Sequence, residues 1–207
     1  MTVNDIDAAP DGPRAISVAT TTFRTIFNSS TGERIEFTDV NRDVVRLNWR
    51  SMPGGAITEH VHPRQRERFI ISEGEAHFTV NGVGHVVGPG ETLDVPAGVR
   101  HSESNQGSVE VVGVVELRPA LGTKEMFEAF AGLAAEGKTT SRGAPKNPLQ
   151  LGATIWNFRH ETRATAPPIW VQNLILPPLW ALAKVCGVRP YYDRWDSRTT
   201  SRSEPTA

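Results

Sequence analysis

Between residues 34 and 117, apolar and polar positions follow one another in short runs bounded by turn-forming residues. Runs of this length, rich in β-branched and aromatic residues, predict β-strands, in which alternate side chains share a face. An additional strand is expected over residues 21–27, with Phe23 and Phe27 on one face. The other strands are expected at residues 34–37, 44–49, 68–71, 76–80, 85–87, 92–95 and 109–117.

Turn residues separate these expected strands. They are Pro53-Gly54-Gly55, Glu73-Gly74, Asn81-Gly82 and Gly88-Pro89-Gly90. An Asn-Gly pair between two β runs predicts a type I′ hairpin, because both central residues of that turn need a positive φ. Many short strands at regular spacing predict a mainly β fold, either a sandwich or a barrel.

After Pro119 the apolar spacing becomes helical. Residues 123–136 place Met126, Phe127, Phe130, Leu133 and Ala134 on one face, with Thr123 as the expected N-cap and Gly137 as the stop. A second helix is expected to open at Asn147-Pro148, with Leu151, Ile155 and Phe158 in register. A third opens at Pro167-Pro168, breaks at Pro177-Pro178, and restarts over residues 179–186 before Gly187.

These patterns divide the chain into four parts. Residues 1–19 are polar and predict a disordered tail, and residues 20–118 form the β domain. Residues 119–192 form a helical C-terminal extension, and residues 193–207 predict a second disordered tail.

Composition and charge argue against nucleic-acid binding, a disulfide within the chain and secretion. The formal net charge of −1 gives no electrostatic reason to expect nucleic-acid binding, and residues 149–158 contain no lysine or arginine for a DNA-recognition helix. Cys186 is the sole cysteine, so no disulfide can form within the chain, and we expect it to be a small buried apolar residue. The N-terminal residues lack the apolar segment of a secretory signal, so a cytoplasmic location is expected.

The apolar stretch from residue 169 to 188 raises the question of a membrane. Gln172, Asn173, the two prolines and Lys184 interrupt it, and a membrane span needs about 20 predominantly apolar residues. We therefore expect this stretch to dock on the barrel or on a second subunit, with docking on a membrane surface as a lesser alternative.

Four residues suggest a metal site. In a strand, His60 and His62 would point to the same side, and Glu67 can face back toward them after the turn at Pro63. His101 follows the turn Pro96-Ala97-Gly98 and can arrive from across a barrel. Three imidazoles and one carboxylate suit one divalent transition metal such as Fe, Mn, Zn or Ni, whereas Ca and Mg prefer oxygen ligands alone.

The residues around these ligands resemble the two cupin motifs. The pattern G-x5-H-x-H-x(3,4)-E-x6-G is matched at Gly54, His60, His62, Glu67 and Gly74, and the pattern G-x5-P-x-G-x2-H-x3-N is matched at Gly90, Pro96, Gly98, His101 and Asn105. The resemblance implies a jelly-roll β-barrel with the metal near one mouth, and it implies a homodimer. The resemblance does not indicate a substrate, because different cupins catalyse many different reactions on the same fold.

Strand alternation extends the site into the barrel. If Glu67 points inward, Phe69 and Ile71 on the same strand point inward too. If His101 points inward, so does Glu103, two residues later. These three residues, Phe69, Ile71 and Glu103, are the expected substrate-binding residues of an apolar cavity with one extra carboxylate. The alternative is that Phe69 and Ile71 simply fill the barrel. His77, His85, Arg66 and Arg68 are expected at the surface or rim.

Two functions remain open on this evidence. The first is a metal-dependent enzyme acting on a small organic molecule, as a dioxygenase with Fe(II) or as a Lewis-acid isomerase or cyclase with other metals. The second is a non-catalytic module that binds a small molecule, with the C-terminal helices serving as an oligomer or membrane-surface docking element.

Overall fold

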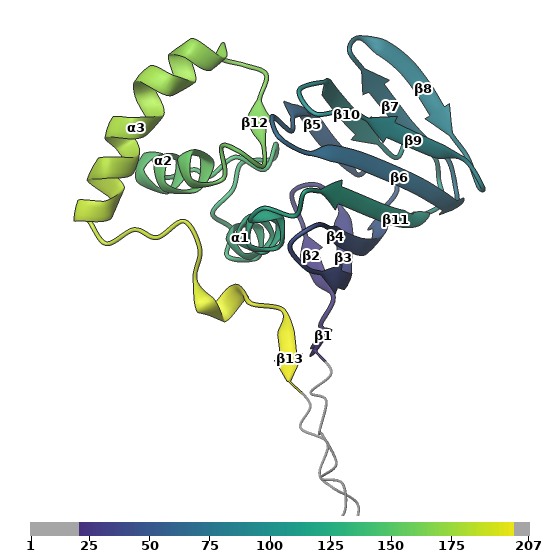
Figure 1. Cartoon of the computed structure of the whole chain (residues 1–207), viewed down its shortest axis with the longest axis horizontal. Helices are drawn as coiled ribbons and strands as arrows, with labels where there is room; N and C mark the ends of the chain where they lie inside the picture. The colour runs from purple at the N-terminus through teal and green to yellow at the C-terminus, as the bar shows by residue number, and fades with distance from the viewer. Residues whose placement is uncertain (1–20, 201–207) are drawn as a thin grey trace, which may run out of the picture.

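The computed structural model describes residues 21–200, and the tail expected over residues 1–19 lies outside them. Strands gather on one side of the molecule and the helices on the other, with α1 (Thr123–Ala135) between the barrel and α2 (Pro148–Asn157) (Figure 1). The mainly β, jelly-roll class with a C-terminal helical extension is confirmed.

Two antiparallel sheets form the barrel. The six-stranded sheet has the order β2-β3-β4-β11-β6-β9, and the five-stranded sheet has the order β12-β5-β10-β7-β8. The six strands are β2 (Ile26–Asn28), β3 (Glu33–Val40), β4 (Val45–Ser51), β11 (Val111–Arg118), β6 (Arg66–Glu73) and β9 (Thr92–Val95). The five strands are β12 (Arg163–Ala164), β5 (Ala56–Val61), β10 (Arg100–Ser104), β7 (Ala76–Val80) and β8 (Val83–Val87).

Alternation of burial along the strands places the core between the two sheets. In β4 every second residue from Val45 to Ser51 is buried, and β6 buries Glu67, Phe69 and Ile71 while Arg66 and Arg68 face outward, as expected. Burial of such apolar side chains is the main favourable term in folding, at about 25 cal/mol per Å². The core includes Ile35, Phe37, Leu47, Trp49, Phe69, Ile71, Phe78, Val115 and Leu117.

The hairpin expected at Asn81-Gly82 joins β7 to β8. Both residues have positive φ, 50° and 84°, and Val80 pairs with Val83 across the turn. The expected strand over residues 21–27 is wrong as a single element. It splits into β1 (Thr21–Phe23) and β2, and Phe27 is 45% exposed because Ile26 and Asn28 occupy the inner face of β2.

The helix boundaries follow local signals. Gly137 has φ 68° just after α1, and the Asn147 side chain accepts hydrogen bonds from the backbone N–H groups of the first turn of α2. Thr123, however, is the first residue of α1 rather than its N-cap, which is Gly122. Cys186 is exposed, not buried, because it follows the last turn of α3 on the outside of the molecule.

The third helix differs from expectation at its two internal prolines. α3 (Ile169–Val185) runs unbroken through Pro177 and Pro178 and packs against α2 (Figure 1). Two prolines remove the N–H groups that would bond to the carbonyls of Asn173 and Leu174, but both of those residues are exposed, so water can satisfy them. Within the described residues, no helix is long and apolar enough to cross a membrane.

The disorder expected from residue 193 is wrong for residues 193–200. They form the short helix η1 (Asp193–Trp195) and the strand β13 (Arg198–Thr200), which pairs with β1. The segment is held because Trp195 packs against α1 and Ser197 donates two hydrogen bonds to the buried carboxylate of Glu128. The polar composition of residues 193–200 gave no indication of these contacts, because their partners are far away in sequence.

Candidate metal centre

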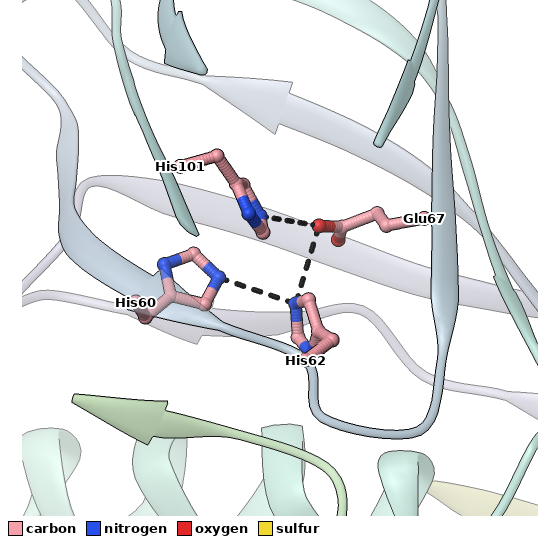
Figure 2. A group of neighbouring side chains, drawn as sticks. All are labelled: His60, His62, Glu67 and His101. Carbon is pink, nitrogen blue, oxygen red and sulfur yellow. Dashed lines mark hydrogen bonds and ion pairs between the residues drawn. The ribbon is translucent and has the colours of Figure 1, made fainter. Parts of the chain in front are cut away.

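Three strands from the two sheets bring the four expected ligands together. His60 lies on β5 and His62 directly follows it, and the antiparallel pairing of β5 with β10 sets His60 opposite His101. Glu67 reaches the same point from β6 in the other sheet. The strand alternation expected from the sequence therefore places all four side chains in one cluster (Figure 2).

The ligand atoms of the cluster lie within 4.8 Å of one another. Glu67 Oε2 is 2.8 Å from His101 Nε2 and 3.2 Å from His62 Nε2, and the Nε2 atoms of His60 and His62 are 3.2 Å apart. His62, Glu67 and His101 are buried, and His60 is partly exposed toward the cavity described below.

The other ring nitrogen of each histidine is held by a backbone carbonyl. Because a carbonyl oxygen only accepts, each Nδ1 is the donor, and the Nε2 lone pair is left facing the cluster. The acceptors are the carbonyl oxygens of Thr58 for His60 (3.0 Å), Glu161 for His62 (2.5 Å) and Val99 for His101 (3.1 Å).

The pKa values of His60 and Glu67 favour the binding of a cation by the cluster. Burial, together with the neighbouring His62 and His101, lowers the pKa of His60 to about 3, so this imidazole is neutral at pH 7. Burial opposes ionisation of Glu67, but His62 and His101 outweigh it and hold the pKa of this carboxyl far below its usual range. Burial also opposes a charge on His62, yet Glu67 raises the pKa of His62 above the ordinary value.

This donor set fits a metal. Three Nε2 lone pairs and a carboxylate that converge so closely repel one another unless a cation or protons lie between them. Nitrogen and oxygen donors in this ratio suit Fe, Mn, Zn or Ni, and they do not identify the metal.

A cavity of about 210 Å³ opens beside the cluster. His60, His62 and Glu67 lie in its wall. The remaining wall is mostly apolar, with contributions from both the barrel and the extension. It includes Trp49, Ile57 and Phe69 from the barrel and Met126, Phe127 and Phe130 from α1.

Two further carboxyl groups face this cavity. Glu33 is fixed, because its two oxygens accept hydrogen bonds from Trp49 Nε1 (2.9 Å) and Thr31 Oγ1 (2.6 Å). Glu103 is 4% exposed, and its carboxyl group has no hydrogen bond to any described residue. Burial first, and then the charges of Glu33 and Glu67, raise the pKa of Glu103 well above its usual range.

The three expected substrate-binding residues have different positions. Phe69 and Glu103 line the cavity. Ile71 does not, because it lies farther along β6 and is packed in the barrel core at 1% exposure, so the alternative that it fills the barrel holds for this residue. The Asn105 side chain donates hydrogen bonds to the backbone carbonyls of Ser51 and Val109.

Sequence reasoning missed several residues around the site. Gln65 lies between two ligands, is fully buried, and donates to the carbonyl of Pro119 (2.7 Å) and to Thr123 Oγ1 (2.6 Å) at the start of α1. Glu33 and the apolar residues of α1 were also missed as cavity residues. The phase of β3 could have indicated Glu33, since it shares the inner face with Ile35 and Phe37.

Residues 48–115 match the family model of the cupin domain. The matched segment is therefore similar to the cupin domain, and it contains all four clustered residues.

Known proteins resemble parts of the chain. Protein SchB of Streptomyces halstedii is 35% identical over 75 residues, 34% of this chain and 54% of that protein, so the match spans about half the length of this curated relative. An uncharacterised conserved protein with a double-stranded β-helix domain from Klebsiella pneumoniae is 25% identical, with a TM-score of 0.40 over 42% of this chain and 72% of that one. A sugar phosphate isomerase from a cupin superfamily of Silicibacter pomeroyi is 18% identical, with a TM-score of 0.43 over 46% of this chain and 71% of that one.

Proposed function

We propose that this protein is a metal-dependent enzyme that acts on a small organic molecule, by a dioxygenase-type or a Lewis-acid isomerase or cyclase-type reaction. One observation carries the proposal. Three histidine Nε2 atoms and the Glu67 carboxylate converge at the wall of a largely apolar cavity of about 210 Å³. A buried cluster of ligands beside a cavity is where a bound metal and a substrate can meet.

His60, His62, Glu67 and His101 would hold the metal. A bound divalent ion of this type supplies Lewis acidity and, with Fe(II), reactivity toward dioxygen. The chain's own part is to orient these ligands, since each Nδ1–H group is fixed by a carbonyl oxygen.

The cavity wall determines which substrate fits. Trp49, Phe69 and Phe127 offer apolar surface that excludes water from one side of the substrate. The carboxyl group of Glu103 has no hydrogen-bond partner among residues 21–200, so a hydroxyl or amine of the substrate would complete its hydrogen bonding. Both oxygens of Glu33 already accept hydrogen bonds, from Trp49 and Thr31, so Glu103 is the better candidate for this part. We therefore propose a substrate with an apolar body and at least one polar hydrogen-bonding group.

The first experiment is elemental analysis of protein purified without oxygen. We expect close to one divalent transition metal per chain, and a large loss of metal in the His60→Ala/His62→Ala double variant. A matched control is His77→Ala/His85→Ala, which removes two histidines from β7 and β8 outside the cluster and should keep its metal.

The second experiment separates an enzyme from a binding module. Dioxygen consumption and product formation are followed with candidate apolar alcohols, phenols and amines, using wild-type protein and the metal-depleted double variant. Wild-type protein that purifies without metal and refuses Fe, Mn, Zn and Ni would refute the proposal.

A further inference from the structure

The carbonyl acceptors of the three histidines come from different parts of the chain. His60 and His101 donate to the carbonyls of residues two positions earlier, within the barrel. His62 donates instead to Glu161, which is 99 positions later and outside the segment that matches the cupin domain. The orientation of one ligand therefore depends on the C-terminal extension.

Glu161 is held in place at three points. It lies in the turn after α2, where its own N–H donates to the carbonyl of Phe158 (3.1 Å). Its side-chain Oε1 accepts a hydrogen bond from the N–H of Gly122 (2.9 Å), just before α1 begins. Two residues later, β12 pairs with β5, with Arg163 opposite Val61 and Ala164 opposite His60.

The side-chain anchor of Glu161 is buried. The residue is 8% exposed, and its Oε2 atom has no hydrogen-bond partner among the described residues. A carboxyl group is costly to bury, and this one belongs to the residue whose backbone carbonyl bonds to His62. Gln65, between His62 and Glu67, donates hydrogen bonds to Pro119 and Thr123 at the start of α1. Glu161 and the loop that contains Gln65 are therefore both hydrogen-bonded to the same short segment.

We propose that Glu161 is a positioning residue for the metal centre. Its side chain anchors the turn on the start of α1, and its carbonyl oxygen holds Nδ1–H of His62 so that the Nε2 lone pair faces the other ligands. The proposal rests on the proposed function, because it requires that the cluster binds a metal. Removal of such an outer partner of a metal-bound histidine typically costs 10- to 100-fold in metal affinity.

The test uses the full-length chain and Zn²⁺ or Ni²⁺ alone as the probe, with affinity measured by competition with a chelator. Glu161→Ala removes the acceptor of Gly122 N–H and frees the turn, so we expect metal affinity to fall by about 10- to 100-fold. Glu161→Gln keeps an acceptor oxygen at this position and should bind metal within about threefold of the wild type.

Glu136→Ala is the matched control. Glu136 anchors the extension elsewhere, accepting hydrogen bonds from Arg194 and Trp195, and it has no contact with the cluster. We expect this variant to lose stability but to keep the wild-type metal affinity. Equal losses of affinity in Glu136→Ala and Glu161→Ala would mean that loosening the extension is sufficient, and the positioning role would be wrong.

A readout on the wild type does not depend on a variant that folds. Long-range ¹⁵N–¹H correlation spectra of the histidine rings report which nitrogen carries hydrogen, and His62 should show a proton on Nδ1. A ring protonated on Nε2 alone, or wild-type affinity in Glu161→Ala, would overturn the proposal. If the wild type binds no metal at all, it is the proposed function that fails.

Discussion

A buried lysine joins α1 to the C-terminal segment, and its removal gives a quantitative test of this packing. Lys124 is 3% exposed, and its Nζ atom lies 2.7 Å from Glu128 Oε1 and 2.9 Å from Asp196 Oδ1. Glu128 is 1% exposed and also accepts hydrogen bonds from Ser197 and Tyr191. In Lys124→Met the apolar stem remains but the carboxylate of Glu128 loses its cation.

The expected cost follows from this geometry. Removing one partner of a buried ion pair costs about 3–5 kcal/mol, because the other charge is left uncompensated. Ser197 N–H, Ser197 Oγ–H and Tyr191 O–H still donate to Glu128, which places the expected loss near the lower end, about 3 kcal/mol. That is a large share of the 5–15 kcal/mol typical of a whole domain.

The assay is denaturant unfolding followed by circular dichroism and by tryptophan fluorescence. Lys138→Met is the matched control, since Lys138 carries the same side chain, is 58% exposed, and pairs with Glu136 at the surface. An exposed pair of this kind contributes about 0–1 kcal/mol, so this variant should be near neutral. A Lys124→Met variant within 0.5 kcal/mol of the wild type would refute the assignment of this ion pair as a stabilising contact.

Three other predictions concern the site and the surface. Metal affinity should fall as the pH drops below 7, because the metal competes with a proton on His62, whose pKa is raised. His60, with a pKa of about 3, stays neutral over this range. Chelator competition at pH 8, 7 and 6 measures the effect, and an affinity that does not change with pH would contradict it. Glu103→Leu should slow turnover of a hydroxyl- or amine-bearing substrate by at least about tenfold, and Glu103→Gln should be closer to the wild type. Steady-state kinetics measure this, and the same kinetics in Glu103→Leu and the wild type would show that Glu103 does not bind the substrate. The homodimer expected from the cupin resemblance is tested by light scattering of the wild type and of Trp170→Glu, which changes a 70% exposed residue of α3; a wild type that is monomeric at all concentrations ends that expectation.

Much of the barrel and the clustering of His60, His62, Glu67 and His101 could be predicted from the sequence because their signals are local. Asn81-Gly82 defines its own turn, and the spacing of His60 and His62 needs only the period of a strand. Glu67 and His101 lie at positions where turn residues bring the chain back toward the same point. For these residues the neighbours along the chain contain most of the information.

The rest could not be predicted because it depends on partners far away in sequence. β13 exists because it pairs with β1, and β12 exists because it pairs with the edge of β5. Ile71 obeys the strand period correctly, yet only the shape of the barrel decides that it faces the core and not the cavity. Glu161 could not be predicted, since it bonds to His62 through a backbone carbonyl that every residue possesses, and its side chain bonds to Gly122, which is also distant in sequence.

The pairing of β1 with β13 has a consequence for protein engineering. Thr21 and Thr200 are direct partners across this small antiparallel ribbon, so the two ends of the described chain lie side by side (Figure 1). Ends this close can be joined by a short linker, and the chain can then be opened elsewhere. A circular permutant opened at the exposed loop near Arg142 would separate the barrel and α1 from α2 and α3 in chain order while retaining every contact of the ligand cluster.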